Sequence, residues 1–523
     1  MEARRYWAAA GIVCVGVGVA VGELIAAFIS PSASPVSAVG QTVIGLLPGG
    51  VKEWAIHLFG THDKMMLLVS MVVVMALLAG VVGLLERARR GLGQLGIGLF
   101  GVVGILAVAM APTTATLSYV APVVAAIVGI LLLSRVSTIF LRTGFAAAAA
   151  GERTTHPAGS ATAHPGHGPT RRSFLAYMGM GAAVAVIAGG AAVIVRQSAV
   201  VVADLRAKVK LPRPVTPAPA VPAAAELAVD GITPLIIDAN NFYRIDTALV
   251  VPTVNSDTWQ LTVTGMVEKE ITLNFAQLLA KPMVETYVTI GCVSNEVGGN
   301  LVGNARWLGW PVRDLLAEAG VKPGADMVLS RSTDGFTAGT PLEAMTDARN
   351  AIIAVGMNGE PLPLVHGFPA RLIVPGLYGY VSATKWLEDL KVTTFAADQG
   401  YWVPLGWDAM GPIKIASRID VPRSGATTST GSTTAAGLAW APERGISAVQ
   451  VQLDGGAWQE ATLAAALNKD TWVQWEVTLS TGAGNHELKV RAVDGSGVLQ
   501  TSEVAPPAPN GASGFHTIQF SSR

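Results

Sequence analysis

Apolar residues are concentrated in the first 200 positions, in long runs that lack the polar face of an amphipathic soluble helix. A helix needs about 20 consecutive apolar residues to cross a bilayer. Five runs have suitable length, and their ionisable residues Glu23 and Arg135 lie toward run ends: Trp7–Ile29, Met65–Leu85, Leu92–Met110, Tyr119–Leu141 and Phe174–Val195. The pattern predicts an α-helical membrane region with five spans and disfavours a bundle of buried soluble helices.

Lysine and arginine residues lie unevenly in the loops between these runs, and cytoplasmic loops of membrane proteins are enriched in both. One set of loops carries most of them: Arg4, Arg5, Arg87, Arg89, Arg90, Arg142, Arg153, Arg171 and Arg172. The opposite set carries Lys52 and Lys64. We therefore expect a multi-pass protein of the cytoplasmic membrane, in contact with lipid. Its N-terminus is cytoplasmic, and everything after residue 196 is extracytoplasmic.

The first four spans, within residues 1–143, contain no histidine inside a helix that could ligate haem. We interpret this region as an anchor, or as a docking surface for an electron carrier or quinone. A cytoplasmic linker follows at 144–170. Its histidines (156, 164 and 167) could bind a metal, but a solvated linker is the simpler interpretation.

Two arginines stand directly before the fifth apolar run, in the sequence TRRSFL at 170–175. The spacing resembles a twin-arginine export signal, which serves domains that fold around a cofactor before they cross the membrane. The alternative is that the arginines only enforce membrane orientation. We assign 171–198 to this signal and the fifth span, and 199–226 to a stiff Pro-rich linker.

The pattern changes after residue 226. Residues 227–395 mix helical segments (Gln277–Leu279 and Val312–Ala319) with buried strands (Tyr287–Cys292, Ala351–Val355 and Arg371–Val374), which predicts an α+β domain. Residues 396–523 alternate with period two, at Ala448–Leu453, Trp472–Leu479 and Glu487–Val493, between turn residues. Such alternation predicts an all-β, immunoglobulin-like sandwich that serves dimerisation or packing.

Composition excludes two classes of protein. The 523 residues carry zero net charge, so nothing indicates nucleic-acid binding. The chain has two cysteines, Cys14 in an apolar run and Cys292 in the polar half, so a disulfide-stapled fold is excluded.

Cys292 ends an apolar strand and begins a polar, glycine-rich loop, where functional groups are often displayed. One cysteine cannot build a structural zinc or iron–sulfur site by itself. Three interpretations stay open from spacing alone: an inert buried thiol, a catalytic nucleophile, or a single bond to a metal that a cofactor carries.

Four motifs occur in a fixed order around this cysteine. They are NFYR at 241–244; Gly291-Cys292 followed by GNARW at 303–307; MNGEPLP at 357–363; and HGFPARLIVPG at 366–376 with KWL at 385–387. Together they resemble the molybdopterin domain of the sulfite oxidase family. The sequence VQLDGGAW at 451–458 resembles that family's dimerisation domain.

The resemblance implies a molybdenum–molybdopterin cofactor with Cys292 as its only protein bond to the metal. It also implies a set of residues around the pterin and its phosphate: Arg244, Ser332, Asp334, His366, Arg371, Ser382, Thr384 and Lys385. Arginine suits phosphate because its planar fork matches two oxygens. Tyr401 resembles the family's active-site tyrosine, and Arg306 and Trp307 are interpreted as packing residues.

One departure bears on the substrate. Sulfite oxidases carry an arginine five residues after the metal-binding cysteine, whereas this chain has Val297 there, preceded by Glu296. We expect an oxidoreductase that transfers an oxygen atom to or from a small sulfoxide, N-oxide or sulfur oxyanion.

Its electrons would pass through a separate cytochrome or quinone-linked partner, and it could form a homodimer. The alternatives are a metal-free, membrane-tethered scaffold that keeps the fold, and a cysteine hydrolase. The hydrolase has no evident base, because the resemblance already assigns His366 to the pterin.

Overall fold

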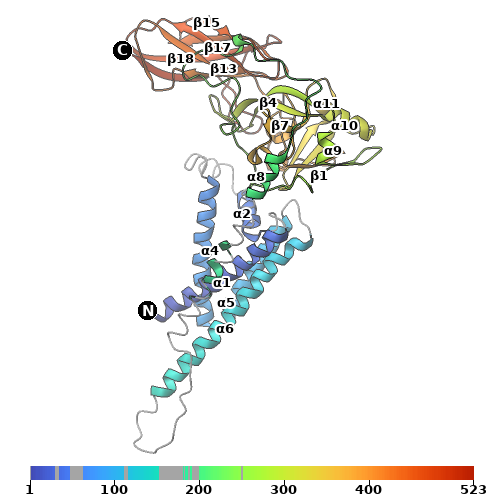
Figure 1. Cartoon of the computed structure of the whole chain (residues 1–523). Helices are drawn as coiled ribbons and strands as arrows, with labels where there is room; N and C mark the ends of the chain where they lie inside the picture. Colours follow the sequence, from blue (N-terminus) through green and yellow to red (C-terminus); the bar gives the residue numbers. More distant parts are fainter. Residues whose placement is uncertain are drawn as a thin grey trace, which may run out of the picture. The chain divides into compact units, whose positions relative to one another are not determined.

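The structure is a computed structural model. It describes residues 2–29, 34–46, 63–110, 116–151, 199–248 and 251–523, with a few positions between 179 and 190. The chain divides into two compact units, Met1–Val200 with Thr247–Val250, and Val201–Asp246 with Val251–Arg523. Each unit is described by itself (Figure 1).

The first unit is helical. Its elements are α1 (Glu2–Ile29), α2 (Pro35–Leu46), α4 (Asp63–Ala88), α5 (Leu92–Met110), η3 (Thr116–Tyr119) and α6 (Val120–Gly151). Four helices are long and apolar enough to cross a membrane, at Arg4–Ala26, Met66–Ala88, Leu92–Met110 and Leu117–Phe140. They match the first four predicted spans, whereas most of the fifth predicted span and the twin-arginine motif lie outside the described residues.

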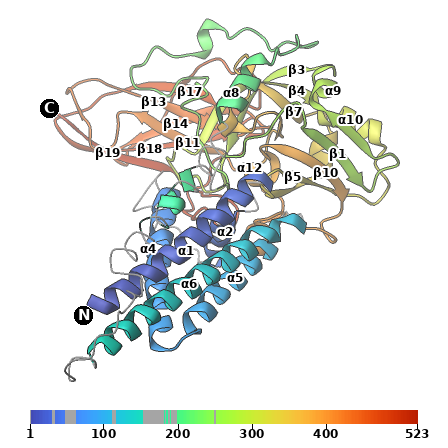
Figure 2. The ribbon, with the colours of Figure 1, turned by 60° about the horizontal axis from the view of Figure 1, so that its bottom comes forward.

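Small residues bring these helices into close contact. Helix α1 packs against α4 and α6, and α6 lies between α1 and α5 (Figure 2). A Cβ atom added to Gly83 would lie 1.9 Å from the Trp7 carbonyl oxygen, and one added to Gly18 would lie 2.4 Å from that of Ala125. Glycine at such positions lets helix backbones approach, which is how membrane helices commonly associate.

The second unit begins with a helix, α8 (Ala199–Lys208), and then builds two sheets. One has the order β2-β1-β10-β5-β6 and the other β3-β4-β7-β8, with β9 pairing to β7. The strands are β1 (Gln260–Gly265), β2 (Ile271–Asn274), β3 (Val284–Gly291), β4 (Val302–Pro311), β5 (Met327–Ser332), β6 (Thr337–Pro341), β7 (Ile352–Met357), β8 (Glu360–Pro361), β9 (Arg371–Ile373) and β10 (Leu387–Thr393).

Short helices connect these strands: α9 (Phe275–Leu279), α10 (Val312–Ala319), α11 (Leu342–Thr346) and α12 (Gly379–Ser382). Helix α9 starts at a capping box, in which the Asn274 side chain accepts from the Gln277 backbone and the Gln277 side chain accepts from Asn274. Helix α10 has the predicted bounds and ends at Gly320, whose φ of 69° is left-handed.

The remaining strands form a second pair of sheets, β11-β13-β17-β16 and β12-β19-β18-β14-β15. They are β11 (Ala416–Val421), β12 (Thr427–Thr428), β13 (Thr433–Trp440), β14 (Ile446–Leu453), β15 (Trp458–Glu460), β16 (Thr462–Leu463), β17 (Val473–Leu479), β18 (Gly484–Asp494) and β19 (His516–Ser522). Burial alternates along β18, as the period-two pattern predicts, and residues of both sheets share one core cluster. We call this part, residues 416–522, the C-terminal sandwich.

Candidate functional site

Cys292 follows strand β3, all of whose last six residues are buried, and it begins the loop that turns back to β4. Its side chain is buried, and its backbone N–H donates to the Leu301 carbonyl at 2.8 Å. Burial raises the pKa of the thiol, while hydrogen bonds from Ser294 and the charge of Lys385 act in the opposite direction. A thiolate at this place therefore needs a positive partner to form.

A small hollow, partly open to solvent, lies beside Cys292. One wall comes from the cysteine loop (Gly291, Cys292, Asn295–Gly298) with Val302 and Tyr378. The other comes from the C-terminal sandwich and the segment before β19: Ile415, Ala416, Ser417, Trp440, Gln500, Ala512, Ser513 and Gly514. Among these lining residues Glu296 is the only charged one at neutral pH, and none is basic.

Arg371 is the most deeply buried cation near the cysteine, at 3% exposure. Its Nη1 donates to the His366 carbonyl and its Nη2 to the Ala383 carbonyl, both at 3.2 Å. Its Nε is buried without a hydrogen-bond partner in the described residues. Burial lowers the Arg371 pKa to about 10, so the side chain stays charged at neutral pH without a nearby carboxylate bonded to it.

Lys385 lies in the same electrostatic cluster. Its Nζ donates to Asp246 Oδ2 and to the Val365 carbonyl, each at 3.0 Å. Burial lowers the Lys385 pKa to about 8, opposed by Asp246. Arg244 shares the same carboxylate through its Nε at 3.0 Å. Arg244 and Lys385 thus share one carboxylate, while Arg371 bonds only to carbonyl oxygens, which leaves this cluster of three cations positive.

His366 adds a second buried atom without a partner. Its Nε2 lies 2.8 Å from the Ala239 carbonyl, so Nε2 carries the hydrogen and Nδ1 presents a lone pair. Nδ1 is buried and has no hydrogen-bond partner in the described chain. Burial and the charge of Arg371 lower the His366 pKa to about 4, so the ring is neutral at physiological pH.

These features fit an anionic, hydrogen-bonding cofactor. Buried polar atoms are normally paired, so an orphaned donor at Arg371 and an orphaned acceptor at His366 indicate a group that pairs with both. The excess positive charge matches the negatively charged phosphate and dithiolene sulfurs of molybdopterin. No cluster of three or more His, Cys, Asp or Glu side chains occurs in the described residues, so a metal here would depend on Cys292 and ligands that a cofactor brings.

The other hydroxyl residues expected at the pterin bond to the protein itself. Ser382 Oγ donates to the Leu377 and Tyr378 carbonyls, and Thr384 Oγ1 lies 2.8 Å from Ser330 Oγ. The family resemblance also implies that backbone groups of residues 382–384 contact the pterin phosphate, and these groups stay candidates for that role.

Ser332 ends β5 and Asp334 lies in the turn that leads to β6, where the Asp334 N–H donates to Ser332 Oγ at 3.4 Å. Tyr401 packs against Phe336 of the same turn, with ring centroids 6.0 Å apart. Burial raises the Tyr401 pKa, and Asp334 adds to the rise. Tyr401 does not line the hollow beside Cys292, so its assignment as the active-site tyrosine stays a prediction.

Two tyrosines that the motifs did not single out lie closer to the cysteine. Tyr243 stacks on Phe242, and its pKa is raised by burial and by Cys292 while Arg371 opposes the rise. Tyr378 lines the hollow, and burial raises its pKa to about 12, with a further contribution from Cys292. Tyr243 lies inside the NFYR motif at 241–244, and Tyr378 follows two residues after the motif that ends at Gly376, which is the signal that could have identified them.

Comparisons with known proteins agree with this arrangement. The family described as oxidoreductase molybdopterin binding domain matches residues 248–402. The uncharacterized oxidoreductase YuiH of Bacillus subtilis is 35% identical over 153 residues, which cover 29% of this chain and 74% of that protein.

Two sulfite oxidases and one solved structure match over a longer part of this chain. The sulfite oxidase of Gallus gallus is 29% identical over 54% of this chain and 71% of its own length. Human mitochondrial sulfite oxidase is 30% identical, and the chain spans only 61% of its length. Among solved structures, the sulfane dehydrogenase SoxCD of Paracoccus pantotrophus matches with a TM-score of 0.49 and 24% identity, over 55% of this chain and 81% of that one.

Proposed function

The chain belongs to the sulfite oxidase family of molybdopterin-dependent oxidoreductases, and on that premise we propose that it removes an oxygen atom from a neutral sulfoxide or N-oxide, with two electrons from a separate donor. We further propose that it acts on the extracytoplasmic side of a membrane. The observation that carries the choice of substrate is the hollow beside Cys292, whose lining holds Glu296 and no basic side chain.

Two basic residues near the hollow add little positive charge to it. Arg418 donates to the Gly299 carbonyl at 2.9 Å, but its Nε is paired with Asp420 at 2.7 Å. His516 Nδ1 accepts from the Ile419 N–H at 3.0 Å, and burial together with Arg418 lowers the His516 pKa. A doubly charged anion would therefore meet the Glu296 carboxylate in a lining that holds no basic side chain, which disfavours its binding.

The cofactor, when bound, supplies the two-electron chemistry and the site of oxygen transfer. The protein's part is to hold it. Cys292 would ligate the molybdenum through its thiolate, and Arg244, Arg371 and Lys385 would neutralise the pterin phosphate. Neutral His366 would accept a hydrogen bond at Nδ1. Tyr378 lines the hollow, and its hydroxyl would donate a hydrogen bond to a substrate oxygen.

Membrane attachment is supported by the four helices that are long and apolar enough to span, and extracytoplasmic location by the distribution of basic loop residues. Electrons would pass to or from a separate partner, a cytochrome or a quinone-linked protein. A sulfur oxyanion is the second candidate substrate, because curated relatives that match over half of this chain carry the name sulfite oxidase.

The experiment measures molybdenum and pterin in the purified full-length protein, alongside Cys292→Ser, and then turnover with three substrates. We expect about one molybdenum per chain. We also expect reduction of a sulfoxide and an N-oxide by a dye donor, and weak oxidation of sulfite. Efficient sulfite oxidation would reject the neutral substrate. Absence of molybdenum and pterin, in protein from a host that makes the cofactor, would favour the metal-free scaffold.

A further inference from the structure

The strand that ends at Cys292 is held from outside the cofactor-binding sheets. A loop of the C-terminal sandwich, Asn468–Trp472, makes three hydrogen bonds to β3. Asn468 Nδ2 donates to the Tyr287 carbonyl at 3.0 Å, Thr289 N–H donates to the Asp470 carbonyl at 2.9 Å, and Trp472 N–H donates to Thr289 Oγ1 at 2.8 Å. The last two bonds lie three residues before the cysteine.

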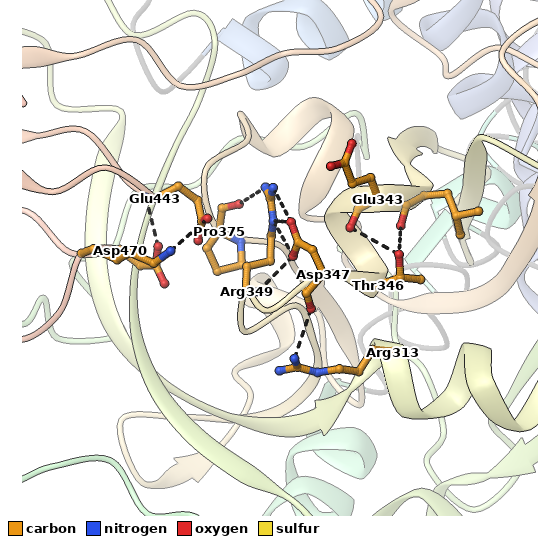
Figure 3. A network of polar contacts seen from close by, with 10 residues as sticks. Arg313, Glu343, Thr346, Asp347, Arg349, Pro375, Glu443 and Asp470 are labelled. Carbon is orange, nitrogen blue, oxygen red and sulfur yellow. Dashed lines mark hydrogen bonds and ion pairs between the residues drawn. The ribbon is translucent and has the colours of Figure 1, made fainter. Parts of the chain in front are cut away.

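The side chain of Asp470 points from this loop toward a second acid. It is 3% exposed, and its Oδ1 accepts from the Glu443 N–H at 3.1 Å (Figure 3). The Glu443 side chain in turn lies against Gly376, since a Cβ added to that glycine would stand 2.8 Å from Glu443 Cγ. Asp470 and Glu443 therefore form an acid pair between β3 and the segment around Gly376.

Arg349 completes this junction between the sandwich loop on β3 and the segment around Gly376. Its guanidinium is fixed on Asp347, with Nη2 2.8 Å from Oδ2, and its Nη1 donates to the Pro375 carbonyl at 3.1 Å (Figure 3). Pro375 and Gly376 precede Tyr378, which lines the hollow beside Cys292. The acid pair and Arg349 thus tie together the two segments that bring Cys292 and Tyr378 to the hollow.

We propose that Asp470 and Glu443 are positioning residues, through which the C-terminal sandwich sets the strand of Cys292 and the segment of Tyr378 relative to each other. The inference rests on the proposed function only in treating Cys292 as the metal-binding group. The coupling itself is a property of the protein chain and can be measured without the metal.

Whether Asp470 carries a proton changes the electrostatic interactions at this junction. Burial, and then Glu443, raise the pKa of Asp470 to about 7. Lys469 lies 3.2 Å from Glu443 Oε2 on the exposed side, and Arg349 faces the pair from the other. Protonated Asp470 places no second negative charge beside Glu443. When Asp470 ionises as the pH rises, its carboxylate is repelled by that of Glu443, which loosens the junction despite the two cations.

The experiment compares Asp470→Asn and Glu443→Gln with Glu460→Gln, an exposed acid of the same sandwich. Full-length protein is prepared with cofactor, and also from a host unable to make it. In the cofactor-free protein, the rate of Cys292 alkylation by iodoacetamide is followed across neutral pH by peptide mass mapping, which separates Cys292 from Cys14. In the holoenzyme, the paramagnetic resonance signal of pentavalent molybdenum is followed over the same range.

We expect wild type and Glu460→Gln to show the same step in alkylation rate near neutral pH, beyond the thiol's own titration. Both acid-pair variants should lose it, with rates changed about two- to thirty-fold, as for coupled packed networks. Asn468→Ala leaves both acids intact and should change the rate without moving the step.

An unchanged step in Asp470→Asn and Glu443→Gln, or its loss in Glu460→Gln, would overturn the proposal. If one acid-pair variant fails to fold, the other and Asn468→Ala still decide. A normal alkylation step in a protein that binds no molybdenum would instead overturn the proposed function and leave the coupling in place.

Discussion

Replacing Arg371 by methionine separates cofactor binding from folding more cleanly than any other single change. The side chain is 3% exposed, packs over the Trp307 ring at 5.1 Å, and has two carbonyl acceptors but no bonded carboxylate. In the cofactor-free protein it is a buried charge with incomplete compensation. In the holoenzyme it would face the anionic pterin phosphate.

The substitution should therefore affect folding and cofactor binding to different extents. Burial lowers the Arg371 pKa from 12.5 to about 10, which corresponds to about 3 kcal/mol against the charged form in the folded, cofactor-free protein. Methionine removes that cost and loses two hydrogen bonds from a charged donor, each worth about 1.5–3 kcal/mol. The lost hydrogen bonds total about 3–6 kcal/mol against a relieved cost of about 3 kcal/mol, so the unfolding free energy of the cofactor-free protein should fall by no more than about 3 kcal/mol.

Cofactor retention should fall, because one charged hydrogen bond to phosphate is worth about 1.5–3 kcal/mol, or about 10- to 150-fold in affinity. Molybdenum and pterin content after dialysis tests this, and denaturant unfolding of cofactor-free protein tests the stability. Arg331→Met is the matched control, since that arginine is 41% exposed and pairs with Asp389. Full retention of molybdenum in Arg371→Met would refute the assignment of this cation to the cofactor.

Three further substitutions test other parts of the molecule. Glu296→Arg should lower the KM for sulfite about fivefold or more, because one unit charge 4 Å from another contributes about 1 kcal/mol in water. An unchanged KM for sulfite would show that this side chain does not face the substrate. Gly83→Leu should disrupt the contact of α1 with α4, whereas Gly98→Leu should be tolerated, because an added Cβ at Gly98 meets nothing within 4 Å. Yield after detergent extraction and thermal unfolding compare the two variants. Equal behaviour would count against the close packing of α1 on α4. His366→Gln should flatten the pH dependence of stability. Because the His366 pKa is about 4 in the folded protein and 6.5 in the unfolded chain, the wild type should lose up to about 3 kcal/mol of stability as the pH falls from 6.5 through 4. An equal loss in the variant would show that another group causes the pH dependence.

Much of this architecture was accessible from local pattern. Val312–Ala319 was expected as a helix from its apolar spacing, and the structure has α10 at those bounds. The first four apolar runs became helices because a continuous apolar run has no competing arrangement that buries it. At the proposed cofactor site, the motif residues His366 and Arg371 are five residues apart and hydrogen-bonded, so their proximity follows from the sequence. Lys385 comes from beyond β9 and α12, and its Nζ donates to the Val365 carbonyl.

The second wall of the hollow could not be predicted in the same way. Ser417, Trp440, Gln500 and Ser513 come from segments far apart in sequence, and period-two alternation says which face of a strand is buried, not what that face meets. Thr289 illustrates the difference. It reads as one more β-branched residue of a buried strand, yet its hydroxyl accepts from Trp472 and donates to Asn304.

The same contacts change how the C-terminal sandwich is to be understood. Taken from the sequence, it is a dimerisation or packing module without chemistry. In the structure, its loop at Asn468–Trp472 bonds the strand that precedes Cys292, and β11, β13 and the segment before β19 line one wall of the hollow where a substrate would lie. A substitution in the sandwich that left the cofactor domain folded and loaded would therefore still alter the reaction. Activity lost with molybdenum retained is the pattern that distinguishes this role from a purely structural one.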